Sequence, residues 1–173
     1  LGRNTLAAQN FTTSTSAYNV AAGFNAGGAV TTGLENTLIG SVAGDALTDA
    51  DYNVALGSSA LGSDTLGSRS TALGYSALFN QNFTTATDSN NTAVGYAAGS
   101  QVTTGIRNTF IGSGAGDSIQ ASSENTAVGY NALTTDTTGS QSTAFGAYAL
   151  QTQNYATGTG ADNVAVGYAA GNA

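Results

Sequence analysis

The 173-residue sequence lacks six residue types on which many functional sites depend: cysteine, proline, methionine, tryptophan, histidine and lysine. Without cysteine, the chain can form neither disulfides nor thiolate metal sites. Without histidine, cysteine and lysine, it has few side chains suited to acid–base or nucleophilic catalysis. Its acidic residues are scattered rather than paired as in a glycosidase, so we expect no enzyme activity in this segment.

Positive charge is also scarce, because three arginines stand against ten acidic residues and the net charge is −7. Nucleic-acid binding requires a basic surface, so we expect no nucleic-acid partner. The uninterrupted apolar runs are only a few residues long, far shorter than a membrane-spanning helix. We therefore expect no membrane insertion in this segment.

A short internal repeat dominates the sequence. The string Asn-Thr-Ala-Val-Gly-Tyr occurs at 91–96 and again at 125–130. Related strings begin near residues 19, 36, 53, 70, 91, 108, 125, 142 and 163, with three steps of 17 residues followed by one of 21. Four steps form a 72-residue super-repeat, since 163 − 91 = 72. We predict that residues 1–173 form a single repeat array and a fragment of a longer fibre.

Each repeat carries one short strand pattern: Asn or Ser, Thr or Val, usually Ala, a larger apolar residue, and Gly. Identical columns at a fixed spacing predict a parallel β-solenoid, in which successive strands lie about 4.8 Å apart. The many Gly, Thr, Ser and Asn residues disfavour helix, and the recurring large apolar residues argue against disorder. We therefore predict an all-β fold, a parallel β-solenoid of about ten coils.

We assign structural roles to four positions of the repeat, counted from its opening Asn or Ser. Glycine in a strand marks a bend or a close backbone contact. We expect the apolar fourth position to form a buried column and the third-position alanines to face another chain. The fifth position holds Gly23, Gly40, Gly57, Gly74, Gly95, Gly112, Gly129, Gly146 and Gly167. The eighth holds Ala26, Ala43, Ala60, Ala77, Ala98, Ala115, Ala132, Ala149 and Ala170. The fourth holds Ala22, Ile39, Leu56, Leu73, Val94, Ile111, Val128, Phe145 and Val166.

The unit Asn125–Gln141 resembles the repeats of phage tail-fibre and tail-spike-like proteins, and Asn53–Gly57 and Asn163–Gly167 are similar to the Ser-Val-Ala-Ile-Gly unit of trimeric autotransporter adhesin heads. The resemblance covers nearly the whole chain. It implies a left-handed parallel β-roll, a homotrimer, and an extracellular location on a virion tail or bacterial cell surface. Because one coil buries only one or two large side chains, lateral association through the Ala/Gly faces would add the missing burial. The extra length of the 17- and 21-residue units predicts loops that bulge outward.

Aromatic residues are the candidate surface contacts for a cell-surface glycan or protein receptor. At the sixth position they could instead pack between chains or along the ladder. In the 21-residue repeats they could instead fold back over the bulging loop. The sixth-position candidates are Phe24, Tyr75, Tyr96, Tyr130 and Tyr168, and the long-repeat candidates are Phe11, Phe83 and Tyr155.

Two pairs of aspartates recur 72 residues apart: Asp45 with Asp117, and Asp64 with Asp136. Calcium prefers several oxygen ligands, but the Gly-rich nonapeptide of calcium β-rolls is absent. We expect solvated turns in which each Asp bonds its local backbone, with no metal and no cofactor. The last position of adjacent repeats holds Arg107 and Glu124, which we expect to be neighbours across the ladder.

The predicted function is that of a structural fibre segment, from a phage tail fibre or surface adhesin, that spaces or displays receptor-binding elements. The alternatives are an adhesin head that binds a surface or glycan directly, a bacterial extracellular filament, and an ice-binding solenoid. Ice binding is disfavoured because Val20, Val54 and Val164 interrupt the second-position threonines and because long loops would break a flat face.

Overall fold

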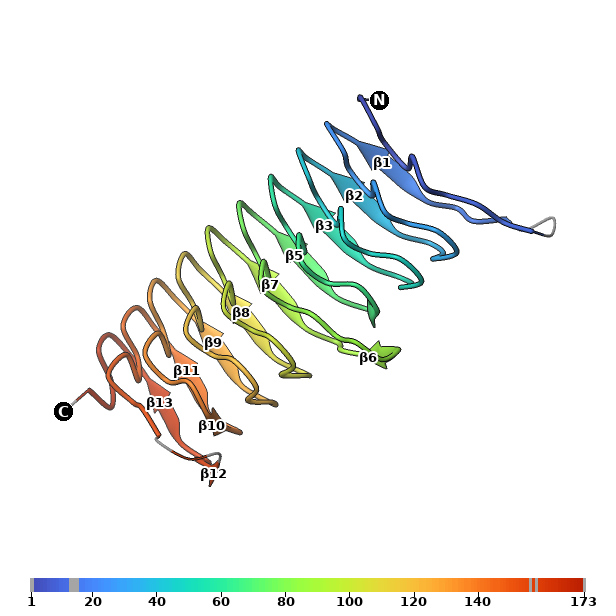
Figure 1. Cartoon of the computed structure of the whole chain (residues 1–173). Helices are drawn as coiled ribbons and strands as arrows, with labels where there is room; N and C mark the ends of the chain where they lie inside the picture. The colour runs from blue at the N-terminus through green and yellow to red at the C-terminus, as the bar shows by residue number, and fades with distance from the viewer. Residues whose placement is uncertain (1, 13–15, 156, 158, 173) are drawn as a thin grey trace.

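The computed structural model describes residues 2–12, 16–155, 157 and 159–172, and it is a single stack of similar coils with the two chain ends at opposite ends of the stack (Figure 1). The described residues contain no helix, and hence none long and apolar enough to cross a membrane. The predicted all-β parallel solenoid is confirmed. It makes about eight turns rather than ten, because the coils at the two ends are incomplete.

Nine three-residue strands form one parallel sheet along the stack. Each strand pairs with the next at equivalent repeat positions, as when Thr92 lies beside Thr109 and Val94 beside Ile111. The strands are β1 (Val20–Ala22), β2 (Thr37–Ile39), β3 (Val54–Leu56), β5 (Thr71–Leu73), β7 (Thr92–Val94), β8 (Thr109–Ile111), β9 (Thr126–Val128), β11 (Thr143–Phe145) and β13 (Val164–Val166). Two further parallel pairs join β4 (Gly67–Ser68) to β6 (Thr87–Asp88) and β10 (Gly139–Ser140) to β12 (Thr159–Gly160).

The asparagine that opens most repeats closes its own coil and also bonds the next one. Asn108 donates from Nδ2 to the carbonyl oxygen of Ser122 at 2.9 Å. Its Oδ1 accepts the backbone N–H of Asn125 in the following coil, also at 2.9 Å. Asn36 and Asn53 make the same two bonds. Because these side chains are fully buried, the position requires a short group that both donates and accepts.

The middle residue of each strand points into the solenoid, while its two neighbours point outward. Ala93 and Phe110 are fully buried, but Ile39 is 37% exposed and Phe145 is 55% exposed. The predictions of a buried fourth column and of third-position alanines open to another chain are therefore wrong. The third and eighth positions line the interior mainly with alanine, and the larger fourth-position residues stay outside. Large residues from other positions, such as Leu47 and Val102, complete the interior. The eighth-position alanines from Ala26 to Ala149 are fully buried, and Ala170 is half-buried.

Large and small residues compensate one another inside the solenoid. A Cβ atom added to Gly44 would lie 2.8 Å from Leu38 Cδ2. One added to Gly99 would lie 2.7 Å from Phe110 Cδ2, and one added to Gly116 would also clash with the Phe110 ring. A large third-position residue thus excludes any side chain at the ninth position of its own coil and the preceding one. In the other two coils of each four-coil super-repeat, the third position is alanine and the ninth is leucine. These leucines are Leu61, Leu78, Leu133 and Leu150.

The fifth-position glycines mark a close approach between successive coils. Their φ angles lie between 125° and 144°, a region that residues with a side chain rarely adopt. A Cβ atom added to Gly112 would also lie 2.5 Å from the carbonyl oxygen of Gly129 in the next coil. Backbone strain and steric exclusion therefore both demand glycine at this column.

Replacing Gly112 with alanine should lower the free energy of unfolding by at least about 2 kcal/mol, because the new Cβ is both strained and obstructed by backbone. Gly62→Ala is the matched control, since Gly62 has no positive φ and the added Cβ would lie no closer than 3.1 Å to the exposed Phe79 ring and 3.3 Å to the carbonyl oxygen of Ser59. Urea unfolding followed by circular dichroism would compare them. Equal effects of the two substitutions would contradict the proposed role of the column.

Phe110→Ala should cost about 3–5 kcal/mol by leaving a cavity. Gly116→Leu alone should also destabilise, because the new side chain would overlap the Phe110 ring. The double variant should regain part of the loss, since it recreates the pairing of Ala127 with Leu133 one coil later but keeps the buried Ile119, which that coil replaces with Asp136. A double-mutant cycle by urea unfolding measures this coupling, and additive losses would refute the compensation.

Candidate interaction surface on the outer face of the sheet

The outer face of the nine-stranded sheet exposes two columns without a single charged residue. Its second position holds Thr or Val, and its fourth holds Ala, Ile, Leu, Val or Phe. Leu56 is 41% exposed and Ile111 is 40% exposed although both are surrounded by other apolar residues of the face. We call these two columns, with the residues that flank them at the last and sixth positions, the sheet face. Contiguous apolar surface of this kind usually marks an interaction site.

An aromatic column follows one edge of the sheet face, where each strand ends. Tyr75 and Tyr96 are 54% and 62% exposed, and their rings stack at 5.4 Å with planes 10° apart. Tyr130 packs edge-on against Tyr148, which in turn meets Tyr168 edge-on. The predicted surface candidates at the sixth position are thus all exposed, and the four tyrosines among them also pack along the ladder. Stacking fixes their rings at little entropic cost, as a contact surface requires.

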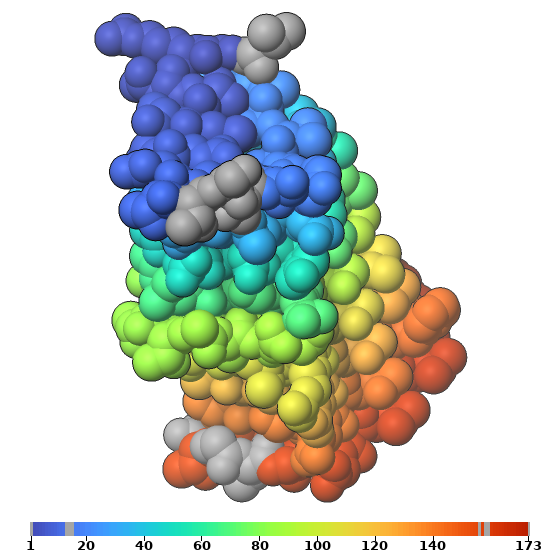
Figure 2. Space-filling model, turned by 90° about the vertical axis from the view of Figure 1, so that its right-hand side faces the viewer, coloured from blue at the N-terminus to red at the C-terminus, as the bar shows by residue number. Residues whose placement is uncertain are grey.

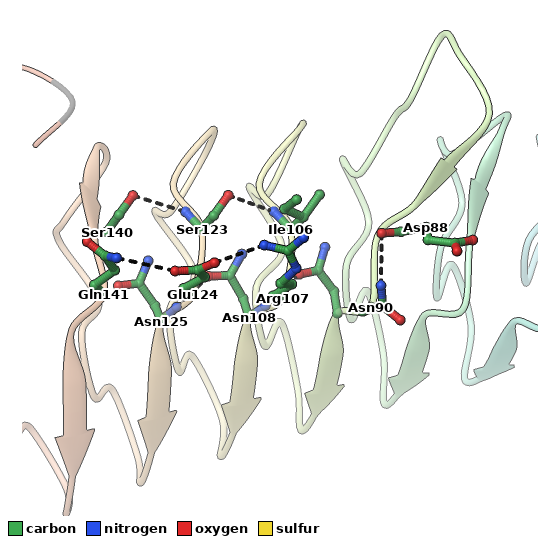
Figure 3. Close-up of polar contacts among 11 residues, drawn as sticks. Asp88, Asn90, Ile106, Arg107, Asn108, Ser123, Glu124, Asn125, Ser140 and Gln141 are labelled. Carbon is green, nitrogen blue, oxygen red and sulfur yellow. Dashed lines mark hydrogen bonds and ion pairs between the residues drawn. The ribbon is translucent and has the colours of Figure 1, made fainter. Parts of the chain in front are cut away.

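A polar column follows the opposite edge, where each strand begins. Arg107 donates from Nη1 to Glu124 Oε1 at 2.9 Å, which confirms the predicted neighbours, and Gln141 Nε2 donates to Glu124 Oε2 at 3.3 Å (Figure 3). Further along the column, Arg69 lies 5.1 Å from the centroid of the Tyr52 ring. Since the side chains of Arg107 and Glu124 are 61% and 43% exposed, their ion pair contributes less than about 1 kcal/mol to the free energy of unfolding.

One position earlier, a second row of side chains bonds the backbone between coils. The N–H of Ile106 donates to Ser123 Oγ at 3.0 Å, and the N–H of Ser123 donates to Ser140 Oγ at 3.1 Å (Figure 3). Asp51 accepts from the N–H of Leu34 in the same way. This row satisfies backbone groups that the short strands leave unpaired, so we assign it a structural role.

The 21-residue coils extend past the edge of the sheet where the strands begin. Figure 1 places β6 and β12 at the far edge of the coils, and Figure 2 looks onto this edge, where the yellow-green long coil stands out beyond its neighbours. The loops are therefore directed outward, as predicted. They do not interrupt the sheet face, so the expectation that they break its flatness is wrong for that side of the molecule.

The aromatic residues of the long coils do not project from these loops. Phe83 is 5% exposed, and its ring lies where a side chain on Gly67 would be. Tyr155 is half-buried and accepts a hydrogen bond on its hydroxyl oxygen from Asn163 Nδ2 at 2.8 Å. Phe11 is also half-buried. The surface-contact prediction is wrong for Phe83, and folding back over the loop is the arrangement that the structure shows.

A buried cluster of hydrogen-bonded polar side chains holds the first complete long coil in place. Ser70 stands where most coils have Asn, and it is too short to close the coil. Gln81 Nε2 donates to Ser70 Oγ at 2.9 Å and also to the Asp64 carboxylate, while its Oε1 accepts from Asn91 at 2.8 Å. Asp64 also accepts from the backbone N–H of Phe83 at 3.1 Å. The expectation of a solvated Asp64 is wrong, because it is fully buried with its acceptors used.

The second long coil repeats this cluster with one compensating change. Asp136 and Gln153 take the parts of Asp64 and Gln81, and Asp136 is likewise buried rather than solvated. In the first cluster, the hydroxyl of Ser89 bonds Ser70, and the aromatic residue equivalent to Tyr155 is the apolar Phe83. In the second, an alanine replaces that serine and the hydroxyl of Tyr155 supplies the polar group. Sequence reasoning missed this cluster, although the paired replacements recur at 72 residues.

Asp45 and Asp117 lie half-buried in turns beside the interior. Partial burial raises the pKa of Asp117 above its ordinary value, and a hydrogen bond from Ser118 at 3.3 Å opposes that rise. Burial likewise raises the pKa of Asp45, against a hydrogen bond from Asn25 at 3.2 Å. Nowhere in the described part of the chain do three or more potential metal-ligating side chains gather.

Asp117→Asn should raise the melting temperature slightly at pH 7, because the charged carboxylate is disfavoured by its surroundings. Because the pKa of Asp117 is raised in the folded chain, ionisation of its carboxyl destabilises the fold. This destabilisation is absent below the ordinary Asp pKa, develops as the pH rises from that pKa to the raised one, and stays constant at higher pH. The advantage of the variant should therefore vanish near pH 3. Thermal unfolding at both pH values measures it, with the exposed Asp49→Asn as control; a pH-independent difference would disprove the assignment.

Comparison of the chain with protein-family models, with curated proteins and with solved structures finds no match.

Proposed function

We propose that this chain is a segment of a structural fibre, from a phage tail fibre or a surface adhesin, in which three copies pack their sheet faces around a common axis. The observation that carries the proposal is that the second and fourth columns of the sheet face are exposed and carry only uncharged Thr and apolar residues. Nine strands about 4.8 Å apart make it about 38 Å long. Surfaces of this size in water are normally covered by a partner.

A second copy of the chain suits this face better than an unrelated partner. Rotational symmetry brings like residues of different copies close together, so charged columns near the axis would repel one another. The second and fourth positions carry no charge in any coil. The charged residues lie instead at the edge of the face or elsewhere on the coils, where they can remain hydrated.

The direction of the long coils supports a role in spacing and display. They extend from the edge away from the sheet, so they stay exposed when the sheet faces are covered. They recur every four coils, which is about 19 Å along the fibre. The buried clusters under Ser70 and Ser142 hold each long coil to the stack. The loops can therefore vary in sequence while the shaft remains unchanged.

Direct binding of a surface or glycan through the aromatic column is the second candidate function. The exposed Tyr75 and Tyr96 rings support it, because such rings commonly stack on sugars and other ligands. The two functions differ in what the sheet face does. In the fibre, it is covered by other copies and any receptor must be met by the long coils, whereas in the adhesin head it stays open to ligand.

Ile111→Glu should convert the assembled chain to monomers, because it places a charge in the middle of the sheet face. Sedimentation velocity would show the parent protein at the mass of a trimer and the variant at the mass of one chain, with circular dichroism unchanged. Thr104→Glu, exposed and outside the sheet face, should leave the trimer intact. A parent protein that sediments as a monomer would refute the fibre proposal.

A further inference from the structure

The two edges of the sheet face differ in chemistry, and a closed ring of copies would bring them together. Around a rotation axis, the edge where strands begin in one copy meets the edge where strands end in the next. Rotation without translation keeps equivalent coils at the same height. Residues that bracket the same strand in one chain therefore face each other between chains. This reasoning rests on the proposed trimer.

At the level of β8, the aromatic edge has a gap. The sixth position holds Tyr96 after β7 and Tyr130 after β9, but the half-buried Ser113 after β8. Tyr96 and Tyr130 thus come from coils two steps apart, about 10 Å along the stack. A planar group about 3.5 Å thick fits in the space between two rings at that separation.

The Tyr96 ring offers a free face to this gap. Tyr75 and Tyr96 come from consecutive coils and stack nearly parallel, at 5.4 Å and 10°. Their ring faces must therefore point along the stack. Tyr75 covers one face of Tyr96, and the other is directed toward the coil of Ser113. The exposed fraction of Tyr96, 62%, agrees with an open ring.

The opposite edge presents Arg107 at the same level, immediately before β8 (Figure 3). Its side chain is 61% exposed, and the ion pair with Glu124 holds it at the surface. A guanidinium stacks well on tyrosine faces and keeps an ion pair in the plane of its nitrogens. The same edge already shows such a contact, because Arg69 lies over the Tyr52 ring at 5.1 Å.

We propose that Arg107 of one copy inserts into the gap over Ser113 of the next copy, against the free face of Tyr96. The gap and the arginine occur at one height, so this contact fixes the axial register of the copies. Glu124 stays paired with the inserted guanidinium, so the charge is not buried alone. The other arginine of this edge, Arg69, meets Tyr75 at its own level rather than a gap.

Paired cysteines test the contact directly, because the chain has no cysteine of its own. Within one chain, Arg107 and Ser113 are separated by β8, on the order of 15 Å or more, which is too far for a cross-linker no longer than an arginine side chain. Arg107→Cys combined with Ser113→Cys should therefore give covalent trimers with a bismaleimide about as long as the arginine side chain it replaces, seen on a denaturing gel. Each single variant should give at most dimers.

The outcome separates this inference from the proposed fibre. Cross-linked trimers support both, a trimer that the bismaleimide does not link overturns the Arg107 contact alone, and a monomer overturns both. A second measurement guards against distortion by the cysteines. Ser113→Tyr fills the gap with a residue that this column already holds at Tyr96 and Tyr130, so the fold should tolerate it.

Ser113→Tyr and Arg107→Gln should each weaken assembly at least tenfold by sedimentation equilibrium. Arg3→Gln removes the same charge from the aromatic edge of the first coil and should change assembly less than twofold. If Ser113→Tyr assembles as well as the parent chain, the gap is not used and the proposal is wrong.

Discussion

The hydrogen bonding between equivalent positions of successive coils is the constraint on which the rest of this structure depends. Since each coil must present the same backbone groups to the next, each coil must repeat the same backbone angles. The left-handed conformations at the seventh position and before each opening Asn recur for this reason, in residues as different as Val42, Ser59, Tyr52 and Arg107. Side-chain identity is free at these positions as long as the backbone conformation is met.

The interior obeys a second, weaker rule that operates over four coils instead of one. A backbone ladder fixes the distance between coils, so the interior volume can be filled only by exchanging residues within a narrow cross-section. Leu38 and Phe110 fill it from the sheet side, and leucines at the ninth position fill it from the returning side. The 72-residue super-repeat is therefore a packing period imposed on a 17-residue hydrogen-bonding period.

The sequence was sufficient to predict the solenoid, the parallel register and the strand positions, because all three follow from a spacing that can be counted. It was not sufficient to predict which side of each strand faces inward. Alternation says only that the third and fourth positions oppose each other. Large apolar residues of the strands were expected inside, but each coil already buries a large residue from the third, ninth or twelfth position, as Leu61 and Val102 show. The strand therefore mostly turns alanine inward and leaves residues such as Ile111 outside.

The buried clusters of the long coils were harder still to predict. Asp64, Gln81 and Ser70 each look like ordinary loop residues, and only their spatial meeting makes them a unit. The available signal was indirect: Ser replaces Asn only in the 21-residue repeats, and Gln recurs eleven residues later in both. The aromatic candidates differ in exposure for the same reason. Exposure at the sixth position follows from the ladder, which can be read from the repeat, whereas the burial of Phe83 depends on the cluster.

The ladder between coils also determines how this molecule would respond to tension. A load applied at the two chain ends acts on all the coil interfaces in series, and each coil is held only by its immediate neighbours. The terminal coil would peel first, followed by the next, each freeing about 58 Å of extended chain for 17 residues. The longer coils would free about 72 Å and also break a buried cluster. A shaft of this design would lengthen in a regular sequence of three short steps and one long step, and so absorb a pull without failing at once.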